Sequence, residues 1–209
     1  MSLNKKNYLD EELWNCVFNN QISDDIKWAI HSDRCLVAAQ LLLAAIDVIS
    51  GIERPKNENI NTSNRYISWC NTYIKMTGEH YKLTGNDLWG ARCGFLHGYT
   101  HLSTEVVKGR ARILSFADNL EYDLISSPLQ NVNITENPAN GLVIVSLKSL
   151  FNFFCLGLVA MRDKIKEDEN LTLLVNSRLQ NMFQSVDLKD SLKQIGENEY
   201  ILNFNASKI

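Results

Sequence analysis

Residues 86–101, NDLWGARCGFLHGYTH, hold an arginine and a histidine whose types and spacing could support chemistry. At about 100° per residue, a helix here sets Arg92 in the middle of an apolar face. A buried guanidinium needs a carboxylate or phosphate partner, because an unpaired buried charge costs several kcal/mol. His97 falls about 140° away. The two side chains can therefore cooperate only if Arg92 reaches round the helix or a second copy of the chain completes the site.

The opposite face of this predicted helix is nearly bare backbone, with Gly90, Cys93, Gly94 and His97 on it and Gly98 just beyond. Such a face allows another helix or a ligand to approach closely. We predict that the helix stops at Gly98, in the C′ position, so that His97 lies in its last turn. The glycines could pack within the chain or across a dimer.

Asp47 is the candidate partner of Arg92. It lies in a second predicted helix, about residues 24–52, which is apolar almost all round from 36 to 49. The exception is a line of polar residues seven apart, Asp33, Gln40 and Asp47. One interpretation is a thin strip facing solvent. The other is that Asp47 pairs with Arg92 and fixes its orientation.

Other chemistry at this helix has less support from the sequence. Cys93, His97 and His101, with Glu105, are residue types that bind zinc, but Gly98 interrupts the helix before His101 and no second cluster completes a site. Cys93 and His97 are one turn apart and could form a thiol nucleophile and base, although a cysteine near a helix end is more often a packing residue. Walker A, GxGxxG, HExxH and GxSxG motifs are absent. We therefore expect no metal and no cofactor.

The elements that must position these residues are mainly helical. The chain has 209 residues, 45% of them hydrophobic and 22% charged, as in an ordinary globular domain. We predict a mainly α single domain over 1–209, a bundle of five to six helices with a small β element in the C-terminal half. Residues 22–100 form the helical core, 101–145 a β-prone insertion, and 146–209 C-terminal helices that pack on the core.

Charge and cysteine content restrict partners and compartment. A net charge of −3 gives no overall basic field, so RNA contact would need a local patch, for which Lys108, Arg110 and Arg112 are the candidates. Five cysteines without a CxxC pair and an N-terminus without a signal peptide predict a cytoplasmic protein. Residues 142–161 are long enough to span a membrane, but they contain Lys148, so we expect a buried core helix and no membrane.

The sequence RCGFLH, from Arg92 to His97, resembles the R-x4-6-H signature of the HEPN superfamily, and residues 22–100 resemble HEPN-like bacterial proteins in the order of their helices. The resemblance implies a four-helix bundle, often a dimer that joins two such motifs at a cleft. Many members are metal-independent endoribonucleases, in which Arg92 would stabilise charge on the scissile phosphate and His97 would act as acid or base. Cys93 departs from the pattern, because active members usually have a polar residue there.

Three hypotheses follow. The first is a homodimeric HEPN-like ribonuclease in which Arg92 and His97 are catalytic, Asp47, Cys93 and His101 support them, and the basic residues Lys108, Arg110 and Arg112 line the rim. The second is a non-catalytic HEPN-like module that binds RNA, a nucleotide or a partner protein. The third is a structural or interaction protein in which Arg92 and His97 have only structural roles.

Overall fold

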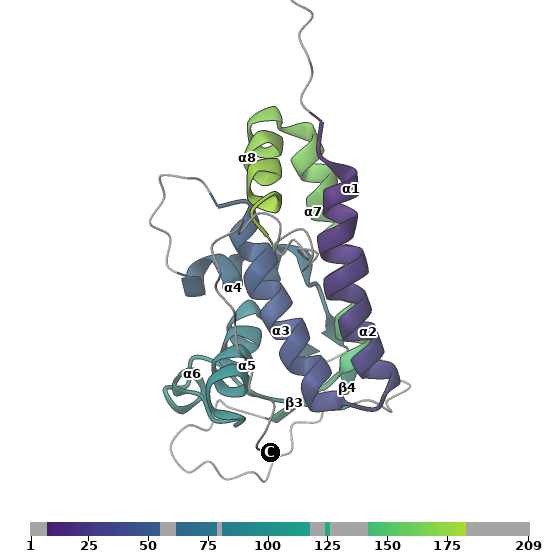
Figure 1. Cartoon of the computed structure of the whole chain (residues 1–209). Coiled ribbons are helices and arrows are strands. Elements are labelled where there is room, and N and C mark those ends of the chain that lie inside the picture. The colour runs from purple at the N-terminus through teal and green to yellow at the C-terminus, as the bar shows by residue number, and fades with distance from the viewer. Residues whose placement is uncertain (1–7, 55–61, 79–80, 118–123, 126–141, 183–209) are drawn as a thin grey trace, which may run out of the picture.

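The structure is a computed structural model that describes residues 8–54, 62–78, 81–117, 124–125 and 142–182 (Figure 1). The predicted mainly α fold is confirmed. Within the described residues, six α-helices have eight residues or more: α2 (Asp24–His31), α3 (Cys35–Ile52), α4 (Thr62–Tyr73), α5 (Gly85–Gly98), α7 (Leu147–Glu167) and α8 (Glu169–Leu179). Two shorter α-helices, α1 (Glu11–Trp14) and α6 (Thr104–Val107), accompany them.

The N-terminal helices form one rod along the side of the bundle (Figure 1). A π-helical segment, η1 (Asn15–Ser23), joins α1 to α2 without a break. The rod ends at His31, so the single helix predicted over residues 24–52 is wrong. The chain turns at Asp33, whose φ of 54° is left-handed. Aspartate tolerates this conformation better than most residues, because its short polar side chain can bond to nearby backbone.

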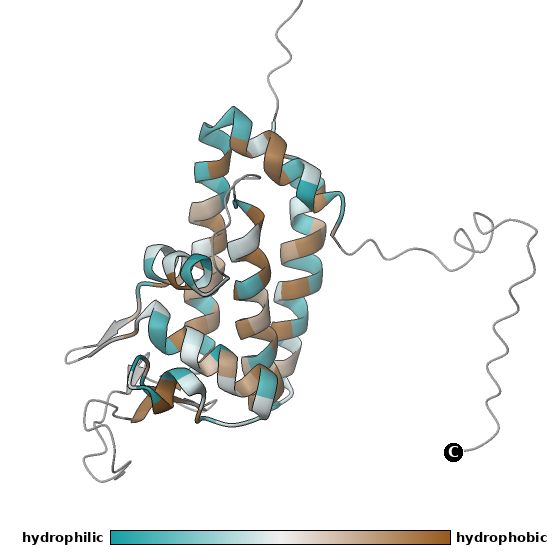
Figure 2. Cartoon of the chain, turned by 90° about the vertical axis from the view of Figure 1, so that its left-hand side faces the viewer, coloured by the Kyte–Doolittle hydropathy of each residue, from teal (hydrophilic) through white to brown (hydrophobic). Residues whose placement is uncertain are grey.

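Helix α3 is the centre of the fold. It contacts α2, α4, α5, α7 and α8, and its side chains Leu42, Leu43, Ile46 and Ile49 are fully buried. One hydrophobic cluster extends from Leu9 before α1 to Leu179 at the end of α8. The other helices alternate between apolar and polar residues along their length, as an apolar face turned to a shared core requires (Figure 2).

The β structure is small. Strand β3 (Ile113–Ala117) pairs in parallel with β5 (Leu142–Ser146), and β4 (Leu124–Ile125) pairs antiparallel with the other edge of β5. A separate two-stranded ribbon joins β1 (Thr77–Gly78) to β2 (Tyr81–Lys82). The predicted β element in the C-terminal half is therefore present. Its predicted part at residues 132–134 lies outside the described residues.

The C-terminal helices close the bundle. Ser146 caps α7, as its side chain accepts a hydrogen bond from the Ser149 backbone, and Asp168 caps α8 in the same way through Leu171. The predicted core helix within residues 142–161 is thus the start of α7. By length and composition one described helix, α3, could cross a membrane, but half of it is buried among other helices, as expected of a core helix.

Candidate functional site

Helix α5 is held in place at both ends. At its start, Thr84 and Asp87 form a reciprocal capping box, in which each side chain bonds to the other residue's backbone N–H. The helix ends at Gly98 as predicted, but the left-handed residue is Tyr99, with a φ of 50°, so the prediction of Gly98 at C′ is wrong. These caps fix the rotation of α5 and hence the direction in which Arg92 points.

Arg92 forms the ion pair predicted with Asp47. Its Nη2 lies 2.6 Å from Asp47 Oδ2, and Arg65 of α4 donates to Asp47 Oδ1 at 3.2 Å. The three side chains are only 16–20% exposed. The guanidinium carbon of Arg92 also lies 5.1 Å from the centre of the Trp89 ring, within cation–π range. Asp47 thus holds two arginines from different helices in fixed positions.

His97 meets Arg92 directly. Arg92 Nη1 lies 2.7 Å from His97 Nε2, so the long arginine side chain reaches round the helix and bridges the angle between the two positions. A guanidinium has no acceptor, so Nε2 must accept this hydrogen bond and the ring proton must be on Nδ1. His97 is otherwise exposed. The cluster therefore presents a fixed cation beside an imidazole at the protein surface.

A groove of about 680 Å³ runs beside this cluster between α3, α4, α5 and the end of α8. It has a partly apolar floor that includes Val48 and Leu96. Three arginines, Arg65, Arg92 and Arg178, line it together with the single carboxylate of Asp47. Three positive charges against one negative charge make the groove suited to an anion such as a phosphate group.

Arg178 has a structural task as well. Its Nη1 donates to the Gly51 carbonyl at 3.1 Å and to the Ile52 carbonyl at 2.7 Å, which satisfies two of the free carbonyls at the end of α3. This interaction ties α8 to α3. Arg178 therefore both stabilises the shape of the groove and adds to its positive charge.

Cys93 contacts Arg92 through its thiol, whereas His101 makes other contacts. Burial raises the pKa of the half-buried Cys93 thiol, and the neighbouring Arg92 offsets this only in part, so the thiol is a poor nucleophile. His101 Nδ1 is 3.0 Å from the Leu114 carbonyl, and its ring meets the edge of Phe95. In the part of the chain that the structure describes, no three His, Cys, Asp or Glu side chains gather as metal ligands would.

The glycine face of α5 packs within the chain. A Cβ on Gly90 would lie 2.6 Å from the Ala111 Cβ, and one on Gly94 would collide with the Thr100 carbonyl oxygen. These two glycines are therefore needed for the close approach of the segment that follows α5. They are not available as a flat dimer surface.

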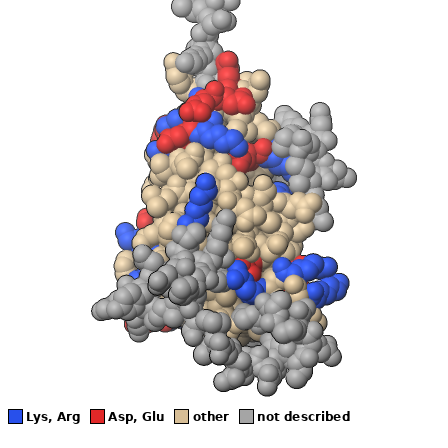
Figure 3. All heavy atoms as spheres, turned by 180° about the vertical axis from the view of Figure 1, so that it is seen from behind, with Lys and Arg blue, Asp and Glu red and all other residues tan. Residues whose placement is uncertain are grey.

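The three residues predicted as a basic rim lie just after α6, where Figure 3 shows a group of basic side chains. Arg110 forms two hydrogen bonds to Glu105, and Arg112 pairs with the buried Asp87 at 2.5 Å. Lys108 is exposed. None of the three lines the groove. Through their ion pairs, Arg110 and Arg112 instead stabilise the positions of α6 and α5.

Two groove residues were not predicted from the sequence. Arg65 is on α4 in a segment that reads as an ordinary amphipathic helix, and Arg178 is on α8 more than a hundred residues further along. The sequence feature that could have indicated Arg65 is Asp47, because a carboxylate in so apolar a helix can accept hydrogen bonds from two cations. Comparison with known proteins adds nothing to these assignments, since no family model, curated protein or solved structure matches the chain.

Proposed function

We propose that this chain is a HEPN-like protein of the cytoplasm that binds single-stranded RNA in the arginine-lined groove and cleaves it without a metal ion. The observation that carries the proposal is the 2.7 Å contact between Arg92 Nη1 and His97 Nε2, beside a groove that Arg92 itself lines. It supports cleavage because one phosphate could contact the fixed guanidinium while the imidazole acts on its neighbouring hydroxyl.

The chemistry is an internal transesterification. The RNA phosphate displaces His97 from Arg92 Nη1, and the freed Nε2 takes the proton of the adjacent 2′-hydroxyl. The 2′-oxygen then bonds to phosphorus, and the bond from phosphorus to the 5′-oxygen breaks. Arg92 stabilises the negative charge that grows on the phosphate oxygens. The products are a 2′,3′-cyclic phosphate and a 5′-hydroxyl.

The leaving 5′-oxygen needs a proton, which a second imidazole can give. Among the described residues His101 bonds to the Leu114 carbonyl, and His31 lines a different hollow, with Lys148. We therefore propose that His97 of a second copy, once released from its own Arg92 and protonated, supplies it, which makes the active form a homodimer. The dimer contact would then lie at the exposed C-terminal end of α5.

A second candidate function is binding without cleavage, of RNA, a nucleotide or a partner protein. The observation that favours it is that Asp47 already occupies Arg92 Nη2 at 2.6 Å and neutralises much of its charge. A guanidinium in such a pair gains less from a developing negative charge. Cys93, beside Arg92, offers no strong hydrogen bond in its place.

One experiment separates these functions. Wild type, His97→Ala and His31→Ala are incubated with labelled single-stranded RNA in EDTA, and binding is measured on the same samples. We expect wild type and the exposed-histidine control His31→Ala to cleave alike, and His97→Ala to lose about a hundredfold or more of the rate. Binding without cleavage in all three samples would favour the second function. If no sample binds or cleaves the RNA, Arg92 and His97 have only a structural role.

A further inference from the structure

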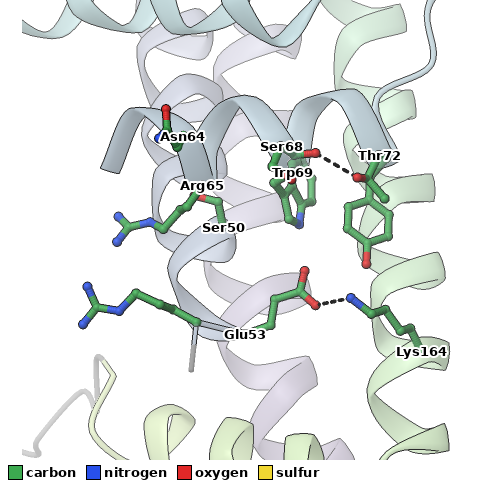
Figure 4. Close-up of a pocket in the computed structure, with 10 residues that line it drawn as sticks. Ser50, Glu53, Asn64, Arg65, Ser68, Trp69, Thr72 and Lys164 are labelled. Carbon is green, nitrogen blue, oxygen red and sulfur yellow. Dashed lines mark hydrogen bonds and ion pairs between the residues drawn. The ribbon is translucent and has the colours of Figure 1, made fainter. Parts of the chain in front are cut away.

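A second hollow, of about 420 Å³, lies between α3, α4 and α7 (Figure 4). Its lining includes Ser50, Glu53, Arg54, Arg65, Ser68 and Lys164. Figure 4 shows Glu53 of α3 meeting Lys164 of α7 on one side of the hollow, at 2.8 Å, with Arg65 of α4 on the other side. Arg92 and His97 do not line it, but Arg65 lines both this hollow and the proposed RNA groove, so the two are neighbours that share one side chain.

The hollow has more positive than negative charge. Arg54, Arg65 and Lys164 line it against the single carboxylate of Glu53, which pairs with Lys164, while Arg65 also pairs with Asp47 outside the hollow. Within the described residues Arg54 is exposed and its side chain has no hydrogen bond or ion pair. The positive charge of Arg54 is thus available to a bound anion.

Guanidinium groups are crowded at this end of α3. Arg65 packs over Gly51, where its Cζ would lie 3.5 Å from an added Cβ, and Arg178 bonds to the Gly51 carbonyl. Burial, together with the charges of Arg54 and Arg65, lowers the pKa of Arg178. Arg54 and Arg65, which line the hollow, therefore add to the positive charge around Arg178, and an anion bound to these two would reduce it.

We propose that this hollow binds a small molecule carrying a phosphate monoester or pyrophosphate group. Arg54 and Arg65 would donate to the phosphate oxygens, with the Ser68 hydroxyl as a further donor at the same wall. A monoester gains more from these two arginines than a diester strand does, because it carries a second negative charge. Trp69 is only 3% exposed, so its ring is not available to stack on a base.

Inorganic pyrophosphate is the probe for the test. Calorimetric titration of the full chain is compared with that of Arg54→Gln, Glu53→Gln and Arg34→Gln. Arg34 is the matched control, since it is an exposed arginine just before the opposite end of α3 and outside the hollow. Circular dichroism and melting temperature confirm that each variant is folded.

We expect Arg54→Gln to weaken pyrophosphate binding by roughly two- to fivefold, the range for one partly exposed charge pair. Glu53→Gln is expected to tighten binding by a similar factor, because it removes the only carboxylate in the lining. Arg34→Gln is expected to bind as wild type does. A gain of affinity from Glu53→Gln is a readout that a merely structural role would not produce.

The proposal is overturned if wild type shows no saturable binding at millimolar pyrophosphate, or if Arg34→Gln weakens binding as much as Arg54→Gln. A competition titration gives a further test, with a single-stranded RNA that has a 5′-hydroxyl and so carries no phosphate monoester. If this RNA displaces pyrophosphate at the concentration at which it binds the protein, the hollow holds the RNA backbone and the proposal is overturned. Arg54 and Glu53 line the hollow and not the groove, and cleavage is tested with His97→Ala, so this result and that of the RNA cleavage assay can be told apart.

Discussion

Replacing Asp47 with asparagine is the sharpest perturbation of the arginine cluster. The change removes the carboxylate charge and keeps the size of the side chain. Asp47 is 20% exposed and accepts from Arg92 at 2.6 Å and from Arg65 at 3.2 Å. A charged hydrogen bond contributes about 1.5–3 kcal/mol, and an unpaired buried charge adds a penalty. Asparagine still offers one acceptor oxygen, so one of the two hydrogen bonds can remain. The bond from Arg65 is the longer and therefore the weaker of the two. We therefore expect Asp47→Asn to lower the free energy of unfolding by about 2–3 kcal/mol.

Urea unfolding followed by tryptophan fluorescence measures this loss, with Asp33→Asn as the matched control. Asp33 lies on the same polar line of the sequence, is exposed, and has a left-handed φ that asparagine also tolerates. We expect the control to change the free energy of unfolding by less than about 0.5 kcal/mol. Equal effects of Asp47→Asn and Asp33→Asn would refute the conclusion that Asp47 holds the two arginines in place.

Three further predictions concern stability and the reacting pair. Burial acts to raise the pKa of Asp87, but hydrogen bonds from Arg112 and Thr84 outweigh it and hold the pKa below its ordinary 3.8. This stabilisation is therefore present above about pH 4 and lost as pH falls through the lowered pKa. We expect Arg112→Gln to destabilise at pH 7 and its deficit in urea to shrink below pH 4; a deficit independent of pH would contradict this. The added Cβ of Gly94→Ala would collide with a backbone carbonyl, so we expect thermal unfolding to show a free energy of unfolding lower by about 1–3 kcal/mol. The control Gly98→Ala meets only a methyl group, at 3.1 Å, and we expect little change. Arg92→Lys keeps the charge but not the planar fork, so RNA cleavage is expected to fall by a larger factor than RNA affinity in gel-shift titrations; an equal fall in both would argue against a role in the chemical step.

The ion pair at the centre of the site was predictable from the sequence because a charge in an apolar helix must be paired. Arg92 and Asp47 each lie among hydrophobic residues in the sequence, and of the two interpretations of Asp47, a solvent-facing strip or a pair with Arg92, the structure has the pair. The mainly α class followed from the same apolar periodicity. The end of α5 at Gly98 was predicted, although the left-handed residue is Tyr99, and the predicted start of the C-terminal helices at residue 146 lies one residue before α7.

Contacts that depend on side-chain reach or on distant segments were not predictable. Helical angles place His97 away from Arg92, yet a long flexible arginine spans the difference. The break at Asp33 depends on local backbone bonding that competes with a strongly helical sequence. Arg178 joins the groove only because α8 folds back on α3, which periodicity within α8 does not indicate.

The most direct test of the central claim is the chemical analysis of RNA ends produced in EDTA by the purified protein. Two single-stranded oligonucleotides are compared, one all-ribose and one with a single 2′-deoxynucleotide at the cleaved position. Transesterification through Arg92 and His97 predicts 2′,3′-cyclic phosphate and 5′-hydroxyl ends from the first and no cut at that position in the second. Cleavage of the deoxy-substituted strand, or 5′-phosphate ends, would contradict the mechanism.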